Sequence, residues 1–367
     1  MQHLPPFAGK FRGGRLEHEP GSVASQFGIS PTLDLGTFSS ILAPGPCRRR
    51  RNGQLACPSS LDADAPGCLS CVRPMSDRES AADQRQVLGA GPTLSYEIVR
   101  PATDPSSASA VTLLCLHGNS SHRGVWRLVA RELVEFRCVL LDFRGHGDSE
   151  HVSPPAYNPE HHADDLAEAV SKLVQSPYAI LAHSAGALAA TRFITNPRLP
   201  ASALMPAAFV WVDLDPLVPR WQVDYFHQGV ASVARTFTTV DDALRGFRRI
   251  YPNIPEDRLR SFVTEGLREV DQGWRMKLDP ATYESWEPGD LRPALPKIAC
   301  PTLVIRGAES IVTSAEGLTA LSDRLPSREV REINGGSHML LLEHPEEVAR
   351  AIRDFIQRQV KVAAPCG

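Results

Sequence analysis

The chain has 367 residues, a formal net charge of −3 and a hydrophobic content of 42%. This composition allows a sizeable hydrophobic core. The small net charge gives no support to nucleic-acid binding, and the absence of any run of about 18 apolar residues argues against a membrane span. The chain also starts without the charged and apolar blocks of a secretory signal.

The eight cysteines lack the regular spacings of a disulfide framework. Cys115 and Cys138 lie within apolar runs, where we expect buried thiols. Cys68 and Cys71 have a C-x-x-C spacing, but no second pair or nearby histidine accompanies them, so we expect no metal site. A reducing, cytoplasmic location is therefore expected, with organelle targeting by the N-terminal region as the alternative.

Residues 1–90 are rich in Pro, Gly, Ser and Arg and show no sustained helical or strand period. Such a segment buries too little apolar area to offset the entropy of ordering, which predicts a disordered or targeting extension. The run Arg48–Arg51 fits a nuclear or anionic-surface signal, or simply a solvated patch. Met75 opens an alternative start, so we expect residues 1–74 to add nothing to the activity.

From about residue 94 onward, short apolar runs alternate with amphipathic patterns. Strands are predicted at Val111–Leu116, Cys138–Leu141, Tyr178–Ala182, Phe209–Val212, Thr302–Ile305 and Val330–Ile333. Helices are predicted at Val125–Val134, after Asn158-Pro159, at Ala187–Thr195, and on Val348, Ile352, Phe355 and Ile356. Asn158 is a favourable N-cap, and proline suits the first helical position. Apolar strands between such helices indicate parallel strands covered on both faces.

Between Pro216 and about Lys297 this alternation stops, and a helical pattern rich in aromatic residues follows. We interpret this segment as a helical cap inserted into an α/β core. The predicted divisions are an extension at 1–90, core at 91–215, cap at 216–297 and core again at 298–360. The aromatic side chains predict an apolar substrate pocket; alternatively, they fill a small core of their own.

The central motif is Ala182-His183-Ser184-Ala185-Gly186, between a predicted strand and a predicted helix. A serine on such a sharp turn presents its hydroxyl at the C-terminal edge of the sheet. The typical pattern is G-x-S-x-G, and Ala182 replaces the first glycine. We predict that Ser184 is a nucleophile.

Two other loops reach the same predicted edge. His117-Gly118-Asn119 follows the first predicted strand of this series, and His338 follows the Val330–Ile333 strand. A tetrahedral oxyanion needs two preorganised N–H donors, which in this arrangement come from Ala185 and Asn119. His338 is the predicted general base.

These motifs resemble the α/β-hydrolase family, and in particular its cap-bearing branch of C–C bond hydrolases, carboxylesterases and epoxide-hydrolase-like proteins. The resemblance covers about residues 94–360. It also rests on Asp142–Ser149 and on Ser337-His338-Met339 followed by Glu343–Glu346. It implies an α/β-hydrolase fold with an inserted cap, in which Asp142–Ser149 stabilises a loop and forms a pocket wall.

The acid of a catalytic triad is less clearly marked. Family members usually carry an Asp in the loop after the penultimate strand, where this chain has Ser310 and Ile311. Asp213, after an earlier strand, and Glu309 are the two candidates, and Asp213 is preferred. Asp215 lies further into the turn and fits less well. The acid fixes the imidazole tautomer, and its loss lowers turnover by about 10⁴.

A serine stands where epoxide hydrolases of this fold carry Asp, which predicts acyl transfer to Ser184 and release by water that His338 activates. Esters, thioesters, lactones and vinylogous diketones with apolar groups suit this chemistry, which needs no cofactor or metal. One alternative is a non-catalytic ligand-binding or scaffold protein of the same fold. Another is a lyase or acyltransferase with the same triad. Arg123, after the oxyanion loop, is assigned no role.

Overall fold

The computed structural model describes residues 83–87, 91–99, 111–175, 177–198 and 205–360. The predicted extension up to residue 82, the alternative start at Met75 and the Cys68 and Cys71 pair lie outside the described residues. A strand, β1 (Asp83–Val87), forms at the end of the region for which we expected no strand. Its sequence DQRQV carries no apolar alternation, so only backbone pairing with the next strand reveals it.

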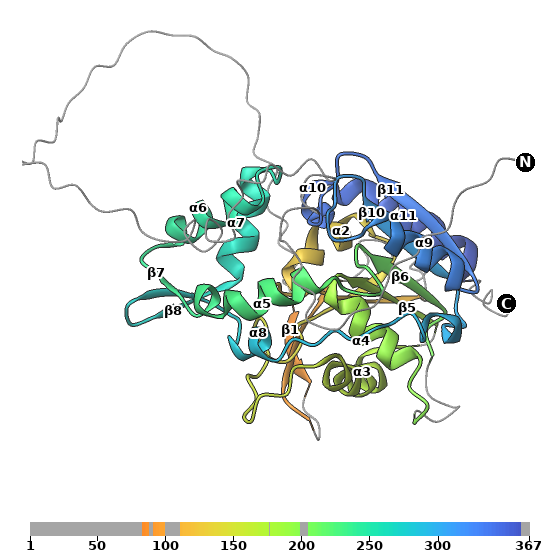
Figure 1. The fold of residues 1–367 in the computed structure, drawn as a ribbon, viewed down its shortest axis with the longest axis horizontal. Helices are drawn as coiled ribbons and strands as arrows, with labels where there is room; N and C mark the ends of the chain where they lie inside the picture. Colours follow the sequence, from red (N-terminus) through yellow and green to blue (C-terminus); the bar gives the residue numbers. More distant parts are fainter. Residues whose placement is uncertain (1–82, 88–90, 100–110, 176, 199–204, 361–367) are drawn as a thin grey trace, which may run out of the picture. The chain divides into compact units, whose positions relative to one another are not determined.

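An eight-stranded sheet lies at the centre of this part of the chain (Figure 1). Its strand order is β1-β2-β4-β3-β5-β6-β10-β11. The further strands are β2 (Leu94–Val99), β3 (Thr112–Leu116), β4 (Arg137–Leu141), β5 (Tyr178–His183), β6 (Ala208–Val212), β10 (Thr302–Gly307) and β11 (Arg328–Ile333). β2 pairs antiparallel with β1 and β4, and the remaining pairs are parallel. The predicted mostly parallel sheet is confirmed.

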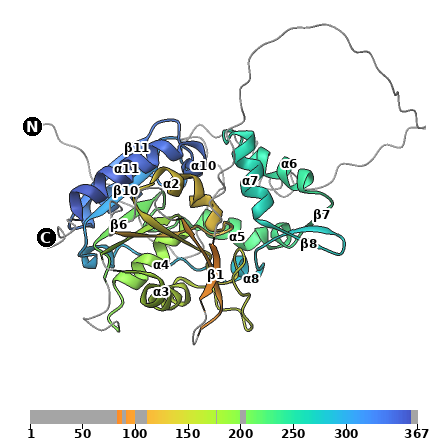
Figure 2. The same ribbon diagram turned by 180° about the vertical axis from the view of Figure 1, so that it is seen from behind.

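Helices cover both faces of the sheet, as predicted (Figures 1 and 2). One face carries α2 (Arg127–Glu132) and α11 (Pro345–Gln359), and the other carries α3 (Pro159–Leu173), α4 (Ala185–Ile194) and α9 (Ala315–Arg324). Alternation along β3 explains the two layers, because Leu113 packs on the first face and Leu114 on the second. Asn158 caps α3 as predicted, by accepting a hydrogen bond from the His161 N–H at 3.0 Å.

The cap segment, residues 216–297, separates β6 from β10. It contains α5 (Arg220–Val233), α6 (Val240–Ile250), α7 (Glu256–Glu265) and α8 (Ala281–Glu284). It also contains an antiparallel sheet of β7 (Thr236–Phe237), β9 (Gly273–Met276) and β8 (Leu267–Val270), which the prediction of a helical cap did not include. These strands have two to four residues, too few for a two-residue period to stand out in the sequence.

Three short elements complete the described part: η2 (Arg123–Trp126), η3 (Leu295–Lys297) and α10 (Leu340–Glu343). Within the described ranges, every helix is too short or too polar to cross a bilayer.

Candidate active site

Five parallel strands, β3, β5, β6, β10 and β11, bring their C-terminal ends to one edge of the sheet. Each of the six residues singled out from the sequence lies directly after one of these strands or within its loop. They are Asn119 after β3, Ser184 and Ala185 after β5, Asp213 after β6, Glu309 after β10 and His338 after β11.

Ser184 occupies a sharp turn between β5 and α4. Its backbone has φ +52° and ψ −126°, a conformation that residues other than glycine rarely adopt and that is typical of functional sites. The turn is held by a 2.8 Å hydrogen bond from the Ser184 N–H to the Val212 carbonyl. A Cβ atom at Gly118 would lie 2.8 Å from the Ser184 Cβ, so the loop after β3 runs directly beside the serine.

The two predicted oxyanion donors, Asn119 and Ala185, directly follow the two residues of this close approach in the chain. Ala185 is the first residue of α4, and the N–H groups of a first helical turn have no acceptor within their own helix. The partial positive charge of the helix N-terminus adds to their attraction for an anion. Asn119 follows Gly118, and its Oδ1 accepts a 2.9 Å hydrogen bond from the Ser120 N–H.

Tyr283 of the cap segment helps to hold the loop that carries Asn119. Ser120 has φ +60°, and its hydroxyl lies 2.5 Å from the hydroxyl of Tyr283 in α8. His146 approaches from the loop after β4, with its Nε2 at 3.1 Å from the Asn119 Oδ1. The loop after β3 is therefore held both by the core and by the cap segment.

Asp213 and His338 meet, although 125 positions separate them in the chain. The His338 Nδ1 lies 2.7 Å from the Asp213 Oδ2, and Asp213 is only 1% exposed. The same Oδ2 accepts a 2.5 Å hydrogen bond from the Ser310 hydroxyl, and the Gly307 N–H lies 3.4 Å from Oδ1. The loop after β10 thus supports a carboxylate that belongs to the neighbouring strand β6.

Burial alone would raise the pKa of the Asp213 carboxyl. The hydrogen bond and the charge of His338, together with the Ser310 hydroxyl, outweigh burial and lower this pKa below its ordinary value. The carboxylate is therefore ionised at neutral pH and can hold a proton on the Nδ1 of His338.

The other two carboxylates that we considered lie elsewhere. Glu309 is exposed, and the imidazole nitrogen that it would have to reach already contacts Asp213. Asp215 accepts a 3.0 Å hydrogen bond from the Ser314 N–H, at the start of α9. Its position there stabilises the first turn of that helix.

His183 makes a contact with the His338 loop that the sequence did not predict. It is the last residue of β5, and its Nε2–H donates a 2.8 Å hydrogen bond to the backbone carbonyl of His338. The two imidazole rings lie 4.7 Å apart. Burial lowers the pKa of His183 to about 3, so the ring is neutral. The only sequence signal was its place directly before Ser184, and its bond ties the His338 loop to the serine turn.

His117 links the loops after β3 and β4. Its Nδ1–H donates to the Gly118 carbonyl at 2.7 Å, and its Nε2 accepts from the Phe143 N–H at 3.0 Å. Burial lowers the pKa of His117 to about 3, which matches a neutral ring with one donor and one acceptor nitrogen. This histidine therefore helps to hold the loop that carries Asn119 in position.

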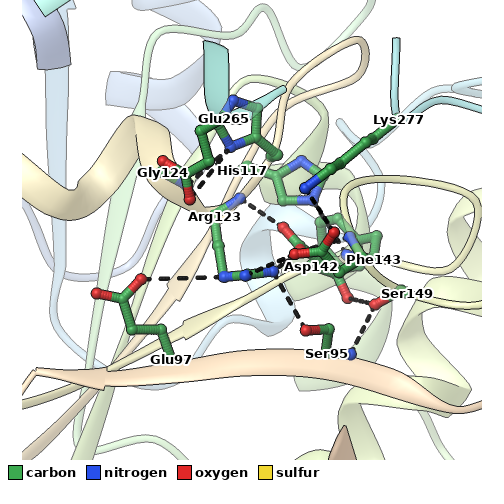
Figure 3. A network of polar contacts seen from close by, with 12 residues as sticks. Ser95, Glu97, His117, Arg123, Gly124, Asp142, Phe143, Ser149, Glu265 and Lys277 are labelled. Atoms are coloured by element: carbon green, nitrogen blue, oxygen red, sulfur yellow. Dashed lines mark hydrogen bonds and ion pairs between the residues drawn. The ribbon is translucent and has the colours of Figure 1, made fainter. Parts of the chain in front are cut away.

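Arg123 lies at the centre of a second polar network, the Arg123 cluster, shown in Figure 3. Arg123 is 1% exposed, and its guanidinium pairs with Asp142 and, at 2.7 Å, with Asp148. Asp142 also accepts a 2.6 Å hydrogen bond from the Arg123 backbone N–H, and Lys277 of the cap segment pairs with Asp148 at 2.7 Å. The cluster joins the loops after β3 and β4 to the cap.

Two pockets lie beside the loop after β3. One is lined by Gly118, Asn119 and Ala185 and reaches Trp286 of the cap segment. The other lies between Ser120–His122 and the cap segment. Both interpretations of the cap aromatics hold in part. Trp286, Phe247 and Phe262 line these pockets, whereas Phe226 packs against Tyr283 and Trp286.

Metal binding finds no support within the described ranges, where no three His, Cys, Asp or Glu side chains are grouped to hold an ion.

Residues 113–351 match the profile of the Alpha/beta hydrolase family. The chain belongs to this family. Among curated proteins, this alpha/beta hydrolase is 28% identical over 253 residues to 2-(acetamidomethylene)succinate hydrolase of Mesorhizobium japonicum, covering 68% of this chain and 88% of the relative. It is 27% identical over 248 residues to pimeloyl-acyl-carrier-protein methyl ester esterase of Xanthomonas campestris pv. campestris, covering 66% of this chain and 94% of the relative.

A solved structure agrees with the family assignment. The crystal structure of E-2-(acetamidomethylene)succinate hydrolase superimposes with a TM-score of 0.65 and 26% identity, covering 75% of this chain and 98% of that chain. The named relatives are hydrolases and esterases, which supports hydrolase activity for this alpha/beta hydrolase.

Proposed function

We propose that this alpha/beta hydrolase is a serine hydrolase that cleaves an ester or a related carbonyl substrate through an acyl-enzyme on Ser184. The observation that carries the proposal is the 2.7 Å contact between the His338 Nδ1 and the buried Asp213 carboxylate. The bond from His183 to the His338 carbonyl ties this pair to the strained turn of Ser184. A positioned imidazole with an ionised partner is what a serine hydroxyl needs to become a nucleophile.

The first half of the reaction transfers the acyl group. Asp213 holds the proton on the Nδ1 of His338, which leaves Nε2 free to take the proton of the Ser184 hydroxyl. The serine oxygen attacks the carbonyl carbon, and the resulting oxyanion accepts hydrogen bonds from the N–H groups of Ala185 and Asn119. His338 then gives its proton to the leaving group as the carbonyl re-forms.

The second half regenerates the enzyme. Water enters, His338 removes one of its protons, and the hydroxide attacks the acyl-enzyme. The same two N–H groups stabilise the second oxyanion. Collapse of this intermediate releases the carboxylic acid, and the proton returns from His338 to Ser184.

We assign the triad acid to Asp213 and not to Glu309. The contact of Asp213 with the His338 Nδ1, its burial and its lowered pKa all support this choice. The exposed side chain of Glu309 argues against the alternative.

The named relatives support hydrolysis of an acyl bond but differ in substrate. One acts on 2-(acetamidomethylene)succinate and the other on a pimeloyl-acyl-carrier-protein methyl ester. The pocket beside Ala185 is lined by apolar and neutral polar side chains, which do not match the two carboxylates of a succinate. We therefore carry over the reaction class, hydrolysis of an ester or a related carbonyl substrate, and leave out the succinate.

A fluorophosphonate probe tests the proposal directly, because it bonds covalently to an activated serine hydroxyl. We expect stoichiometric labelling of the wild-type chain, seen by intact mass, and none of Ser184→Ala. Hydrolysis of p-nitrophenyl esters should fall on the order of 10⁵-fold or more in the same variant. Ser171→Ala, which removes an exposed hydroxyl on α3, is the matched control and should label normally.

Absence of labelling in a folded wild-type protein would refute the proposal that the protein is a serine hydrolase and would favour a non-catalytic, ligand-binding role.

A further inference from the structure

The pocket lined by Asn119, Ala185 and Trp286 opens directly beside the proposed oxyanion site. Both residues that we assign as oxyanion donors, Asn119 and Ala185, form part of its wall, as does Gly118 next to Ser184. A carbonyl oxygen held between the two N–H groups therefore places one substituent of the carbonyl carbon in this pocket. The chemistry of the pocket wall then decides which acyl group the enzyme accepts.

Most of the wall is apolar or carries neutral hydroxyls. Phe143, Leu188 and Trp286 supply buried hydrocarbon surface, and Tyr157 and Thr282 add hydroxyl groups. The described residues that line this pocket include no lysine, arginine, aspartate or glutamate.

Two histidines in the wall are also uncharged. Burial lowers the pKa of His146 to about 3 and that of His162 well below its ordinary value. Neutral imidazoles offer hydrogen bonds to a polar neutral group but no charge to balance an anion. The Nδ1 of His162 is buried and has no hydrogen-bond partner among the described residues.

Cations close to the pocket are already paired with carboxylates. The Arg144 guanidinium makes two hydrogen bonds to Asp165, at 2.5 and 2.6 Å. Arg123 is held within the Arg123 cluster, and Lys277 pairs with Asp148. The Tyr157 hydroxyl in the pocket wall bonds an acid and not a cation, because it donates to Asp279 at 2.5 Å.

We propose that this pocket accepts an uncharged acyl group and rejects an acyl group that ends in a carboxylate. The inference rests on the proposed serine-hydrolase function and adds the substrate class. A buried carboxylate in this wall would lose its hydration without gaining a cation, which strongly disfavours its binding.

The test uses two esters with acyl chains of the same length. p-Nitrophenyl hexanoate carries a neutral chain, and the mono-p-nitrophenyl ester of adipic acid ends in a carboxylate. We expect kcat/KM to be about 30-fold or more higher for the hexanoate. An adipate ester that reacts as fast or faster, while Ser184 still labels with fluorophosphonate, overturns the inference alone. Failure of both turnover and labelling would instead refute the proposed function.

A charge placed in the wall provides a second test. His162→Arg adds an unpaired cation at the pocket, and we expect it to shift the kcat/KM ratio about tenfold or more toward the adipate ester. His162→Gln is the neutral control and should shift the ratio less than about twofold. A folded His162→Arg protein with an unchanged ratio would contradict the inference.

If His162→Arg does not fold, the preference for an uncharged group can still be tested on the wild-type protein. Two alkyl fluorophosphonates, one ending in a methyl group and one in a carboxylate, can be compared by their labelling rates at Ser184. We expect the methyl-ended probe to react about tenfold faster or more. Equal rates, or a faster carboxylate-ended probe, would overturn the inference.

Discussion

The Arg123 cluster and the Asp213–His338 pair are two buried polar networks at the same edge of the sheet, but their charges are arranged differently. In the Arg123 cluster the guanidinium faces the carboxylate of Asp142 (Figure 3). It also pairs with Asp148, which meets Lys277, so the charges compensate one another. The Asp213 network ends on an imidazole that is 25% exposed. A closed network holds loops together, whereas a network with an open end can transfer a proton.

This contrast predicts which property each substitution affects. Changes in the Arg123 cluster should lower the free energy of unfolding. Changes in the Asp213 network should lower turnover and leave the folded protein intact.

Between these two networks, the largest expected effect is that of Asp213→Asn on turnover. Asparagine keeps the shape but favours the wrong imidazole tautomer, so we expect kcat for a p-nitrophenyl ester to fall about 10⁴-fold. Glu309→Gln is the control and should change kcat less than about twofold, because an exposed charge contributes little. Stopped-flow acylation rates and a thermal melt would check both. Equal losses in the two variants would rule out Asp213 as the acid.

The second effect is on stability. Arg123→Met leaves the buried Asp142 without its cation, and removal of one partner of a buried pair typically costs about 3–5 kcal/mol. The control is Arg220→Met on α5, which removes an i,i+4 pair whose arginine is 73% exposed and should cost less than about 1 kcal/mol. Urea denaturation measures both values. Similar midpoints for the two variants would contradict a closed, structural role for the Arg123 cluster.

A smaller effect on stability should follow from pH. His117, His146 and His183 have pKa values of about 3 in the folded protein, below the usual 6.5. Because the unfolded chain takes up these protons first, stability is fully present above pH 6.5 and is lost as the pH falls toward 3. Each histidine should cost about 1 kcal/mol between pH 6.5 and 5.5. Chemical denaturation at several pH values tests this, and a flat profile would contradict buried, neutral histidines.

Ser310→Ala should have the smallest effect. It removes one of the hydrogen bonds that hold the Asp213 carboxylate, and we expect kcat to fall about tenfold with KM nearly unchanged. Ser310→Thr keeps the hydroxyl and should retain most of the activity. If the serine merely packed, the alanine variant would keep its kcat.

The Ser310 position also allows a sharper test of the open network. Its hydroxyl bonds the same Asp213 oxygen that meets the His338 Nδ1, so a carboxylate at position 310 should reach the imidazole. We expect Asp213→Asn with Ser310→Asp to recover about tenfold or more of the turnover that Asp213→Asn loses. A double variant no faster than the single one would show that the acid cannot be moved.

Much of the fold could be predicted from the sequence because its signals are local. Apolar runs such as that at β5 mark buried strands, and Asn158-Pro159 marks the start of α3 through hydrogen bonds within one turn. The strands that escaped prediction are β1 in a polar segment, β2, and β7 to β9 in the cap segment. The sequence of β2, LSYEIV, has alternating apolar residues that could have marked it, whereas β1 and β7 to β9 are defined by their pairing partners and not by their own residues.

The sequence by itself determined the order of the elements, and with it the edge at which Ser184 and His338 lie, because parallel strands deliver their following loops to one side of the sheet. The sequence did not decide which residue is the triad acid, since Asp213 and Glu309 both follow strands that end at this edge of the sheet. Only the tertiary structure decided which carboxylate meets His338, and it also revealed the bond between His183 and the His338 carbonyl. Those contacts join residues more than 120 positions apart, and strand order and loop geometry, which no local pattern encodes, bring them within hydrogen-bonding distance.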